Sequence, residues 1–544
     1  MRLLLLFFPL LLLAQPQQGD GIWLRNAFYG EAQTFDACVG HQPGNGQYHH
    51  HASPTCLRAQ LGDNVELVRS TRTGPVYREN PTKASPILGW AFDGHPIYGP
   101  YATINGAVRR VRSSFRLRTI MARQSLPEWV QPLHVGVSPQ LAANQYGPPI
   151  NAQFPLGRYL EDYEFVAGLG DLDIYNGRFA PTAEYPQGIY AYHVTLEEDG
   201  APAFPYIFAA QFYGTVSGGT DRNVPATAMD TTASDDPLLA TWQTKNNSQT
   251  ALHVVGTDPS AAPAPLANPA NADVQRLRAT DANVYLNSNN LASYVMGPWF
   301  DALQPGGIFR GLPTNQNLSI RLPRTPTAAS TRTTVGLGAQ GLWVNGVAVF
   351  NFLDGSSYSN ARATDVGGGL VSPSAYHVSA ASFERGPLAA GSYATAFPLF
   401  GGDVNGTVTI VDSAGVSHTA ETSYVSDTQT NYRIPPSAAL GNATVSIGNG
   451  RANVNIVATY PNLFAGVPVG GGFVSVYGTG LGSATSATAT VNAQPASVSY
   501  AGPQGEFAGL DQFNIQIPAG VTGVAEIVIT AAGKRSNAIT VSLQ

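Results

Sequence analysis

Short runs of aromatic and β-branched residues, separated by turn residues, recur along almost the whole chain. The run 188–195 contains Tyr, Ile and Val, and the run 525–530 contains Ile, Val and Ile in succession. Turn residues are abundant, since the 544 residues include 58 Gly and 40 Pro. Apolar runs of this kind, bounded by closely spaced turns, are typical of strands, and helical periodicity is scarce. The sequence therefore predicts an all-β chain.

The charge balance excludes some partners. Lys and Arg total 29 and Asp and Glu total 35, which gives a net charge of −6, and only 12% of the residues are charged. Such a chain has no concentration of positive charge that would attract a phosphate backbone or an anionic membrane. We expect no nucleic-acid partner.

The N-terminus has the features of a signal peptide. Arg2 precedes the apolar run 3–13, which only Pro9 interrupts, and Ala14 stands before a polar stretch. This run is much shorter than the ~20 residues that cross a membrane. We predict a signal peptide over 1–14, cleaved near Ala14. The mature chain is expected to be secreted or at the cell surface, without a transmembrane segment.

Two cysteines, Cys38 and Cys56, are the only ones in the chain. Export to an oxidising compartment favours a disulfide between them. The alternative, a pair of thiolate metal ligands, requires reduced sulfur and is disfavoured by export. We predict the disulfide.

Four of the ten histidines lie between these cysteines: His41, His49, His50 and His51. In an extended chain, side chains alternate between faces, so His49 and His51 share one face and His50 the other. His41 stands about one hairpin length upstream. Because neutral imidazoles are preferred ligands of zinc and copper, we predict a copper or zinc ion held by His41, His49 and His51. The alternative is a solvated His-rich turn that binds nothing specific.

Further candidate residues lie outside this loop. His95 and His193 are second-choice ligands, and Asp93 is placed to orient His95. The alternative is that Asp93 starts a turn and His95 only packs. The other four histidines are interpreted as structural or surface residues: His134, His253, His377 and His418.

Three functions remain open. The first is metal binding by a secreted or cell-surface protein. The second is a metal-dependent hydrolase or oxidase that uses the same histidines, with Asp93 or Glu184 as the general base. The third is purely adhesive, in which β-sandwiches bind a cell-surface or extracellular ligand and the histidines are structural.

Composition divides the chain into segments. A Tyr- and His-rich domain is predicted over 21–216, followed by a linker of small and polar residues over 217–272. A second structured segment runs over 273–368, where Asn345-Gly346 between apolar runs indicates a two-residue hairpin loop. Strands at regular spacing predict two β-sandwich modules, 376–460 and 461–544.

The histidine region resembles a known family. The blocks 36–41, 46–51 and 54–57 are similar to the signature of the YHYH domain, which occurs in secreted and cell-surface proteins. Later blocks resemble the rest of that domain: 87–100, 172–178, 184–186, 190–193 and 203–206. One departure is His50, which stands where the family motif has a second Tyr. The resemblance implies a secreted or cell-surface location and a site in the histidine region. It does not imply a particular reaction.

A second set of blocks resembles the same family but occurs at a different place in the order of blocks along the chain. The blocks 297–299, 321–326 and 341–351 resemble the part that normally precedes the Cys-Gly-His block. Either the domain is circularly permuted or a second copy has lost its histidine half, and the single occurrence of each half favours permutation. We then expect 273–368 to pack on 21–216, because each half by itself would leave exposed strand edges. The residues expected to bury against Trp90 and Tyr192 are Trp343, Val347, Val349 and Phe350.

The C-terminal tail resembles an immunoglobulin-like domain of the IPT/TIG type that recurs in bacterial secreted proteins. The similarity lies in the blocks 476–482, 500–503 and 509–518. It implies a β-sandwich fold and an extracellular location, and no reaction.

Overall fold

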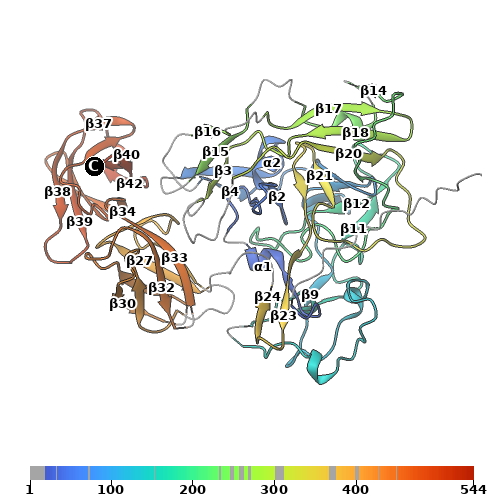
Figure 1. The fold of residues 1–544 in the computed structure, drawn as a ribbon. Helices are drawn as coiled ribbons and strands as arrows, with labels where there is room; N and C mark the ends of the chain where they lie inside the picture. The colour runs from blue at the N-terminus through green and yellow to red at the C-terminus, as the bar shows by residue number, and fades with distance from the viewer. Residues whose placement is uncertain are drawn as a thin grey trace, which may run out of the picture.

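The structure is a computed structural model, and most of its regular secondary structure is strand, which confirms the predicted all-β class (Figure 1). It describes residues 19–543 apart from 32–33, 72–73, 152–153, 232–234, 245–249, 256–262, 267–270, 300–311, 367–374, 399–403, 427 and 449. The predicted signal peptide, 1–14, lies outside the described residues. The helices within this part of the chain are short, and none has the length and apolar character to cross a membrane.

The first body comprises residues 19–366, at the right in Figure 1, and is organised by a seven-stranded sheet. This sheet joins segments that are far apart in the sequence, since Leu342 pairs with Trp90 and His50 pairs with Val349. In order across the sheet the strands are β11 (Gly177–Ala180), β12 (Ile189–His193), β6 (Pro96–Tyr98), β5 (Ile87–Ala91), β21 (Gly341–Trp343), β22 (Ala348–Val349) and β2 (His49–His50).

One hydrophobic core runs through this body, from Ile22 to Tyr358. Trp90, Tyr192 and Trp343 belong to it, and all three are almost completely buried. Large side chains of this kind contribute about 1.5–3 kcal/mol each when they are fully buried. The core therefore includes side chains from both 21–216 and 273–366.

Smaller sheets surround the seven-stranded one. Three of them have three or five strands: β1 (Leu24–Asn26) with β23 (Leu353–Ser359) and β24 (Thr364–Val366); β13 (Gly219–Thr220), β20 (Leu318–Pro323), β18 (Asn283–Ser288), β17 (Val274–Ala279) and β14 (Met229–Asp230); and β16 (Ala264–Pro265), β15 (Leu252–Val255) and β19 (Met296–Trp299). Three have two antiparallel strands: β3 (Val65–Thr71) with β4 (Gly74–Glu79), β7 (Tyr101–Ile104) with β8 (Ala107–Arg110), and β9 (Phe115–Leu117) with β10 (Tyr163–Phe165).

Short helices fill the connections of this body. The α-helices are α1 (Ala27–Glu31), α2 (Thr55–Gln60) and α3 (Pro237–Ala240), and the 3-10 helices described are η2 (Glu128–Leu133), η3 (Ala143–Gln145) and η4 (Leu160–Asp162). α1 follows β1 directly and is joined to the start of β23, where the Ala27 amide donates to the Phe352 carbonyl at 2.8 Å.

The range 217–272 differs from the predicted linker. Its described parts contain β13, β14, α3, β15 and β16, and β13 and β14 form the two edges of the five-stranded sheet. Leu238 and Trp242 are buried in the common core, and the Thr241 hydroxyl accepts a hydrogen bond from the Trp90 indole at 3.0 Å. Small polar residues are compatible with a linker, but they also suit short edge strands, which need few large side chains.

The predicted hairpin at Asn345-Gly346 is present, with a longer loop than expected. β21 and β22 pair in an antiparallel manner, and the Trp343 amide donates to the Val347 carbonyl at 2.8 Å. The loop therefore has three residues instead of two, and Gly346 adopts a φ of 77° at its end. A three-residue hairpin loop needs a left-handed residue at this place, which glycine adopts without strain.

Two further modules follow, at the left in Figure 1, each with its own hydrophobic cluster. The first contains a four-stranded and a five-stranded sheet: β25 (Ala375–Ser379), β27 (Tyr393–Pro398), β31 (Thr430–Arg433) and β30 (Glu421–Val425); then β26 (Leu388–Ala389), β33 (Gly450–Val457), β32 (Gly441–Ile447), β28 (Val408–Val411) and β29 (Ser417–Thr419). The second has the same plan: β34 (Asn462–Gly470), β35 (Phe473–Thr479), β39 (Asp511–Gln516) and β38 (Val498–Pro503); then β37 (Gln494–Ala496), β36 (Thr488–Val491), β40 (Gly523–Ala531) and β41 (Lys534–Arg535), with β42 (Ile539–Leu543) beside β40.

Candidate metal centre

Three imidazoles converge at one edge of the seven-stranded sheet. His49 starts β2, and His41 forms an isolated antiparallel bridge with it. The Nε2 atom of His49 lies 3.0 Å from Nε2 of His41 and 3.0 Å from Nε2 of His51. All three side chains are buried, and among the described residues they form the one group of three or more His, Cys, Asp or Glu side chains placed to hold a metal ion.

The alternation of an extended chain explains why His50 is not part of this group. β2 pairs with β22, where the Phe350 amide donates to the His50 carbonyl at 3.0 Å. The His50 side chain is directed away from the group and lies 3.0 Å from the Tyr294 hydroxyl through Nε2. The substitution of the family's second Tyr by His50 therefore leaves the three convergent imidazoles untouched.

Each of the three imidazoles is fixed through its other nitrogen. Nδ1 of His49 lies 2.8 Å from the Gln47 carbonyl, and Nδ1 of His51 contacts the Asn351 carbonyl. Nδ1 of His41 lies 2.6 Å from the Thr34 hydroxyl. That hydroxyl already donates its proton to a carbonyl, so it accepts from His41.

These contacts assign the tautomers. Carbonyl oxygens only accept hydrogen bonds, so the proton of each neutral ring lies on Nδ1. Each Nε2 atom therefore presents a lone pair towards the other two. Metal-binding histidines are characteristically oriented in this way, by donating from the second nitrogen to a carbonyl or carboxylate.

Glu31, the last residue of α1, is a member of the site that the sequence did not indicate. Its Oε2 atom lies 3.4 Å from Nε2 of His41 and 3.1 Å from Nε2 of His51. The side chain is only 12% exposed, and Oε2 is buried without a hydrogen-bond partner. A buried carboxylate oxygen thus lies next to two of the three imidazole nitrogens, where it is available as a further donor.

The electrostatics of the site keep its groups in metal-binding form. Burial lowers the pKa of His41 and lowers the pKa of His49 well below the ordinary value. Burial raises the pKa of the Glu31 carboxyl, but its electrostatic interaction with His41 and His51 outweighs this effect and holds that pKa below its usual range. Neutral imidazole and ionised carboxylate are the forms that bind metal ions, and both are present at neutral pH.

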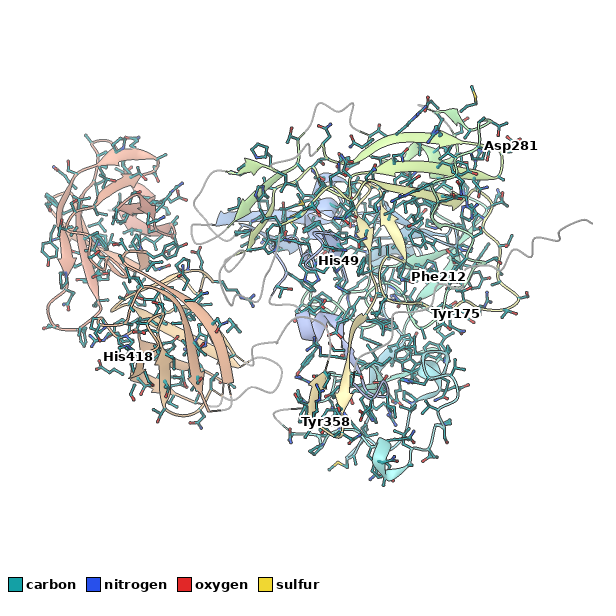
Figure 2. The ribbon with its side chains drawn as sticks, in the orientation of Figure 1. His49, Tyr175, Phe212, Asp281, Tyr358 and His418 are labelled. Carbon is teal, nitrogen blue, oxygen red and sulfur yellow. A yellow bond between two sulfur atoms is a disulfide. The ribbon has the colours of Figure 1, made fainter. Side chains whose placement is uncertain are left out.

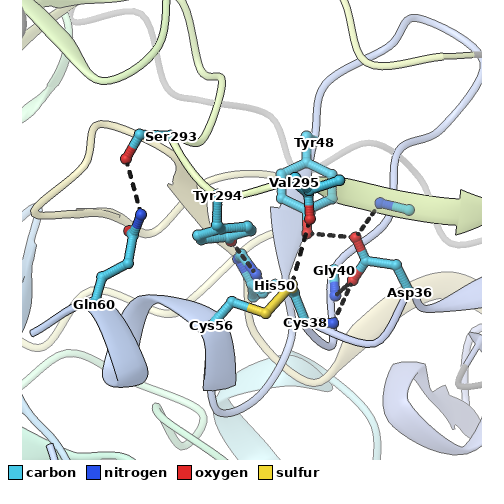
Figure 3. Close-up of a disulfide and its surroundings, with 11 residues drawn as sticks. Asp36, Cys38, Gly40, Tyr48, His50, Cys56, Gln60, Ser293, Tyr294 and Val295 are labelled. Atoms are coloured by element: carbon cyan, nitrogen blue, oxygen red, sulfur yellow. Dashed lines mark hydrogen bonds between the residues drawn. A yellow bond between two sulfur atoms is a disulfide. The ribbon is translucent and has the colours of Figure 1, made fainter. Parts of the chain in front are cut away.

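The predicted disulfide between Cys38 and Cys56 is present, with the Cα atoms 5.0 Å apart (Figure 3). Asp36 lies beside it and accepts hydrogen bonds from the amides of Cys38 and Gly40, each at 2.9 Å. The same carboxylate accepts from the Tyr48 hydroxyl at 2.8 Å. The loop that carries the histidines is thus anchored at both ends by a covalent bond and at its centre by a buried carboxylate.

Aromatic rings line the site. The ring of Phe350 stacks on that of His49, with centroids 3.8 Å apart and planes at 20°. Phe35 packs edge-on against His41, with centroids 4.7 Å apart. These apolar neighbours exclude water and strengthen the electrostatic interaction of the donors with a cation.

His95 and Asp93 form a separate group. Asp93 Oδ2 lies 3.1 Å from Nδ1 of His95 and accepts from the Tyr192 hydroxyl at 2.6 Å and the Gly214 amide at 2.8 Å. His95 also packs edge-on against Tyr190. Asp93 contacts His95, its predicted role of orienting His95 stays a prediction, and neither residue joins the three convergent imidazoles.

His193 and Glu184 are also placed elsewhere. His193 ends β12, and its Nδ1 atom lies 3.2 Å from the Gly99 carbonyl. Glu184 accepts a hydrogen bond from the Tyr98 hydroxyl at 2.8 Å. Four strands lie between β12 and β2, so the two are five strand spacings apart. At about 4.8 Å per spacing this distance is roughly 24 Å. The sheet order therefore prevents His193 from sharing an ion with His49.

Comparison with solved structures gives only remote similarity. Two matches are SGBP-B from a xyloglucan utilization locus of Bacteroides uniformis (13% identity, 30% of this chain and 46% of that chain, TM-score 0.14) and SGBP-B from a mixed-linkage glucan utilization locus of Bacteroides ovatus (13%, 40% and 59%, TM-score 0.20). The surface glycan-binding protein PbSGBP-B of Prevotella bryantii matches at 14% identity, over 30% of this chain and 40% of that chain, with a TM-score of 0.12. The chain thus spans about half the length of the first two proteins.

Comparison with families is more specific. No curated protein matches the sequence. A family model described as YHYH protein matches residues 12–206, which include all three convergent histidines, Glu31 and the disulfide. The part of the chain that carries the candidate metal centre is therefore similar to the YHYH family.

Proposed function

We propose that this protein binds a divalent transition metal ion, copper or zinc, through His41, His49 and His51. The observation that supports this most strongly is the convergence of three Nε2 lone pairs, with neighbouring nitrogen atoms 3.0 Å apart. No proton lies between them in the tautomers that the hydrogen bonds assign, so the three lone pairs repel one another unless a cation is shared. Buried groups of this kind are stable when they coordinate a metal.

The donor set fits such an ion. Three imidazole nitrogens and one carboxylate oxygen suit zinc and copper. The sulfur atoms of Cys38 and Cys56 are joined in the disulfide and are not available as thiolates. When bound, the ion supplies a fixed positive charge that offsets the buried Glu31 carboxylate. The three histidines bind the ion, and the acceptors at their Nδ1 atoms, two carbonyls and the Thr34 hydroxyl, orient the rings.

We propose that the protein acts outside the cytoplasm. The disulfide supports this location, because disulfides form and persist in oxidising compartments. The predicted signal peptide over 1–14 supports the same location. Phe350 packs on His49 and Phe35 packs on His41, and these apolar surroundings favour metal binding over hydrolysis.

The experiment is a titration of metal-free protein with Cu²⁺ and Zn²⁺ in competition with a chromophoric chelator at neutral pH. The wild type is expected to bind one ion per chain, and the double variant His49→Ala, His51→Ala is expected to lose this binding. His418→Ala is the matched control, because His418 lies in the first C-terminal module, far from His49 (Figure 2). Equal binding by the wild type and the double variant contradicts the proposal.

A further inference from the structure

The four donor atoms follow one another in a ring. Going round it, the contacts are 3.0 Å from His41 to His49, 3.0 Å from His49 to His51, 3.1 Å from His51 to Glu31 and 3.4 Å from Glu31 back to His41. Each histidine contact is between Nε2 atoms, and each Glu31 contact is to Oε2. Every donor thus has two close neighbours.

The remaining two pairs lie across this ring. Glu31 makes ion-pair contacts with His41 and His51 within 4.0 Å but none with His49, although all four residues are described. The rings of His41 and His51 are 5.5 Å apart, farther than His41 from His49 at 4.5 Å or His49 from His51 at 4.8 Å. His49 therefore stands opposite Glu31, and His41 stands opposite His51.

Simple geometry distinguishes two arrangements. Four donors about 2.1 Å from one ion lie about 3.0 Å apart along the edges of a square and about 4.2 Å across it, whereas every pair in a tetrahedron lies about 3.4 Å apart. Here three edges are 3.0–3.1 Å, the fourth, between Glu31 and His41, is 3.4 Å, and the Glu31–His49 pair is beyond 4.0 Å. The donors match a square better than a tetrahedron.

We infer that Glu31 is the fourth ligand and that the four side chains form a tetragonal site, with three nitrogens and one oxygen, for Cu²⁺. The inference rests on the proposed metal-binding function and names its metal. Tetragonal sites of nitrogen and oxygen donors are characteristic of Cu²⁺ and Ni²⁺, and Cu²⁺ binds more tightly than the other divalent ions of its row. Structural zinc sites, in contrast, are almost always tetrahedral.

The fold fixes Glu31 in this place. α1 is held against the start of β23 by the hydrogen bond from Ala27 to Phe352, and a side chain at Gly30 would collide with Arg25 and Asp354. The Thr34 hydroxyl donates to the Glu31 carbonyl at 2.7 Å and also anchors His41. One hydroxyl thus positions two of the four ligands.

The test is electron paramagnetic resonance of the full chain loaded with one equivalent of Cu²⁺. The wild type is expected to give an axial spectrum with superhyperfine splitting from three nitrogens. Glu31→Gln is expected to shift the g and hyperfine values and to lower the Cu²⁺ affinity at least tenfold. Glu164→Gln is the control, because Glu164 pairs with Arg116 on the surface, and it should leave both unchanged.

The outcomes separate the two proposals. If the protein binds one ion but the wild-type spectrum is that of a tetrahedrally distorted centre, or if Glu31→Gln gives the wild-type spectrum, the tetragonal site is overturned and metal binding stands. If neither Cu²⁺ nor Zn²⁺ binds, both proposals fail. The wild-type spectrum decides the geometry even where a variant does not fold.

Discussion

The Gly297 amide donates a hydrogen bond of 2.9 Å to the Asp36 carboxylate across 261 positions of sequence. The same carboxylate holds Tyr48 and the amides of the disulfide loop. Asp36 thus connects the histidine loop to the segment that follows 273. Burial raises the pKa of Asp36 to about 6, so the carboxylate is ionised at neutral pH and accepts all four hydrogen bonds.

Asp36→Asn is expected to destabilise the first body by about 2 kcal/mol or more. The amide group replaces one acceptor oxygen by a donor, and a buried donor left without an acceptor costs about 1–3 kcal/mol. Denaturant unfolding measures the difference. Asp281→Asn, at an exposed turn (Figure 2), is the control and should change the free energy of unfolding by less than about 0.5 kcal/mol. Equal effects of the two variants would contradict the role of Asp36.

The segments 21–216 and 273–366 are proposed to be the two halves of one permuted domain. Strand pairing across the two segments in the seven-stranded sheet supports this, as does their common core. A protease site inserted at Asp235 should give, after cleavage, two fragments that elute together without denaturant. Fragments that separate and each remain folded would support a remnant second copy instead.

Much of the site was predictable because it depends on local geometry. The alternation of side chains placed His49 and His51 on one face and His50 on the other, and the hairpin-like approach of His41 followed from its short separation. The disulfide followed from the presence of only two cysteines. The family blocks added the extent of the domain, which the family match over 12–206 supports.

The rest depends on tertiary packing. Glu31 is a single carboxylate ten positions before His41, and its approach to His51 is set by the packing of α1 on β23. The strand order of the sheet keeps His193 away from His49, and that order depends on pairings between segments far apart in the sequence. The small polar residues of 217–272 fit edge strands and linkers equally well, so the strands there were not predicted.

Removal of the disulfide should weaken both the fold and the metal site. The double variant Cys38→Ser, Cys56→Ser opens a loop with a sequence separation of 18, and a loop of about this size accounts for about 3 kcal/mol of stability. His41, His49 and His51 lie in this loop. Without the disulfide the loop is less ordered before it binds the ion, so the entropic cost of ordering it weakens metal binding. Thermal unfolding and chelator competition of the same samples should show a lower Tm and a weaker affinity. An unchanged affinity would show that the loop is ordered without the disulfide.

Acid should affect the two C-terminal modules in opposite directions. Burial lowers the pKa of His377 to about 3, so between pH 6.5 and 3 the unfolded chain binds a proton that the folded module does not. The free energy of unfolding of this module should fall by about 2 kcal/mol between pH 7 and pH 5. Burial raises the pKa of Asp511 to about 6, so between pH 6 and 3.8 the folded module binds the extra proton. That module should gain about 1 kcal/mol over the same interval.

Hydrogen exchange of the full chain, followed by mass spectrometry and corrected for intrinsic rates, measures each module separately. His377→Phe should remove most of the acid sensitivity of the first module and leave the second unchanged. A change of the same sign in both modules would contradict the assignment of these two groups.

The most direct test of the metal centre is anomalous diffraction from crystals of the full chain, with data collected at the copper and the zinc absorption edges. The account predicts one anomalous peak about 2 Å from Nε2 of His41, His49 and His51, stronger at the copper edge. A protein that shows no peak there after incubation with either metal, or a peak held by other residues, would contradict it.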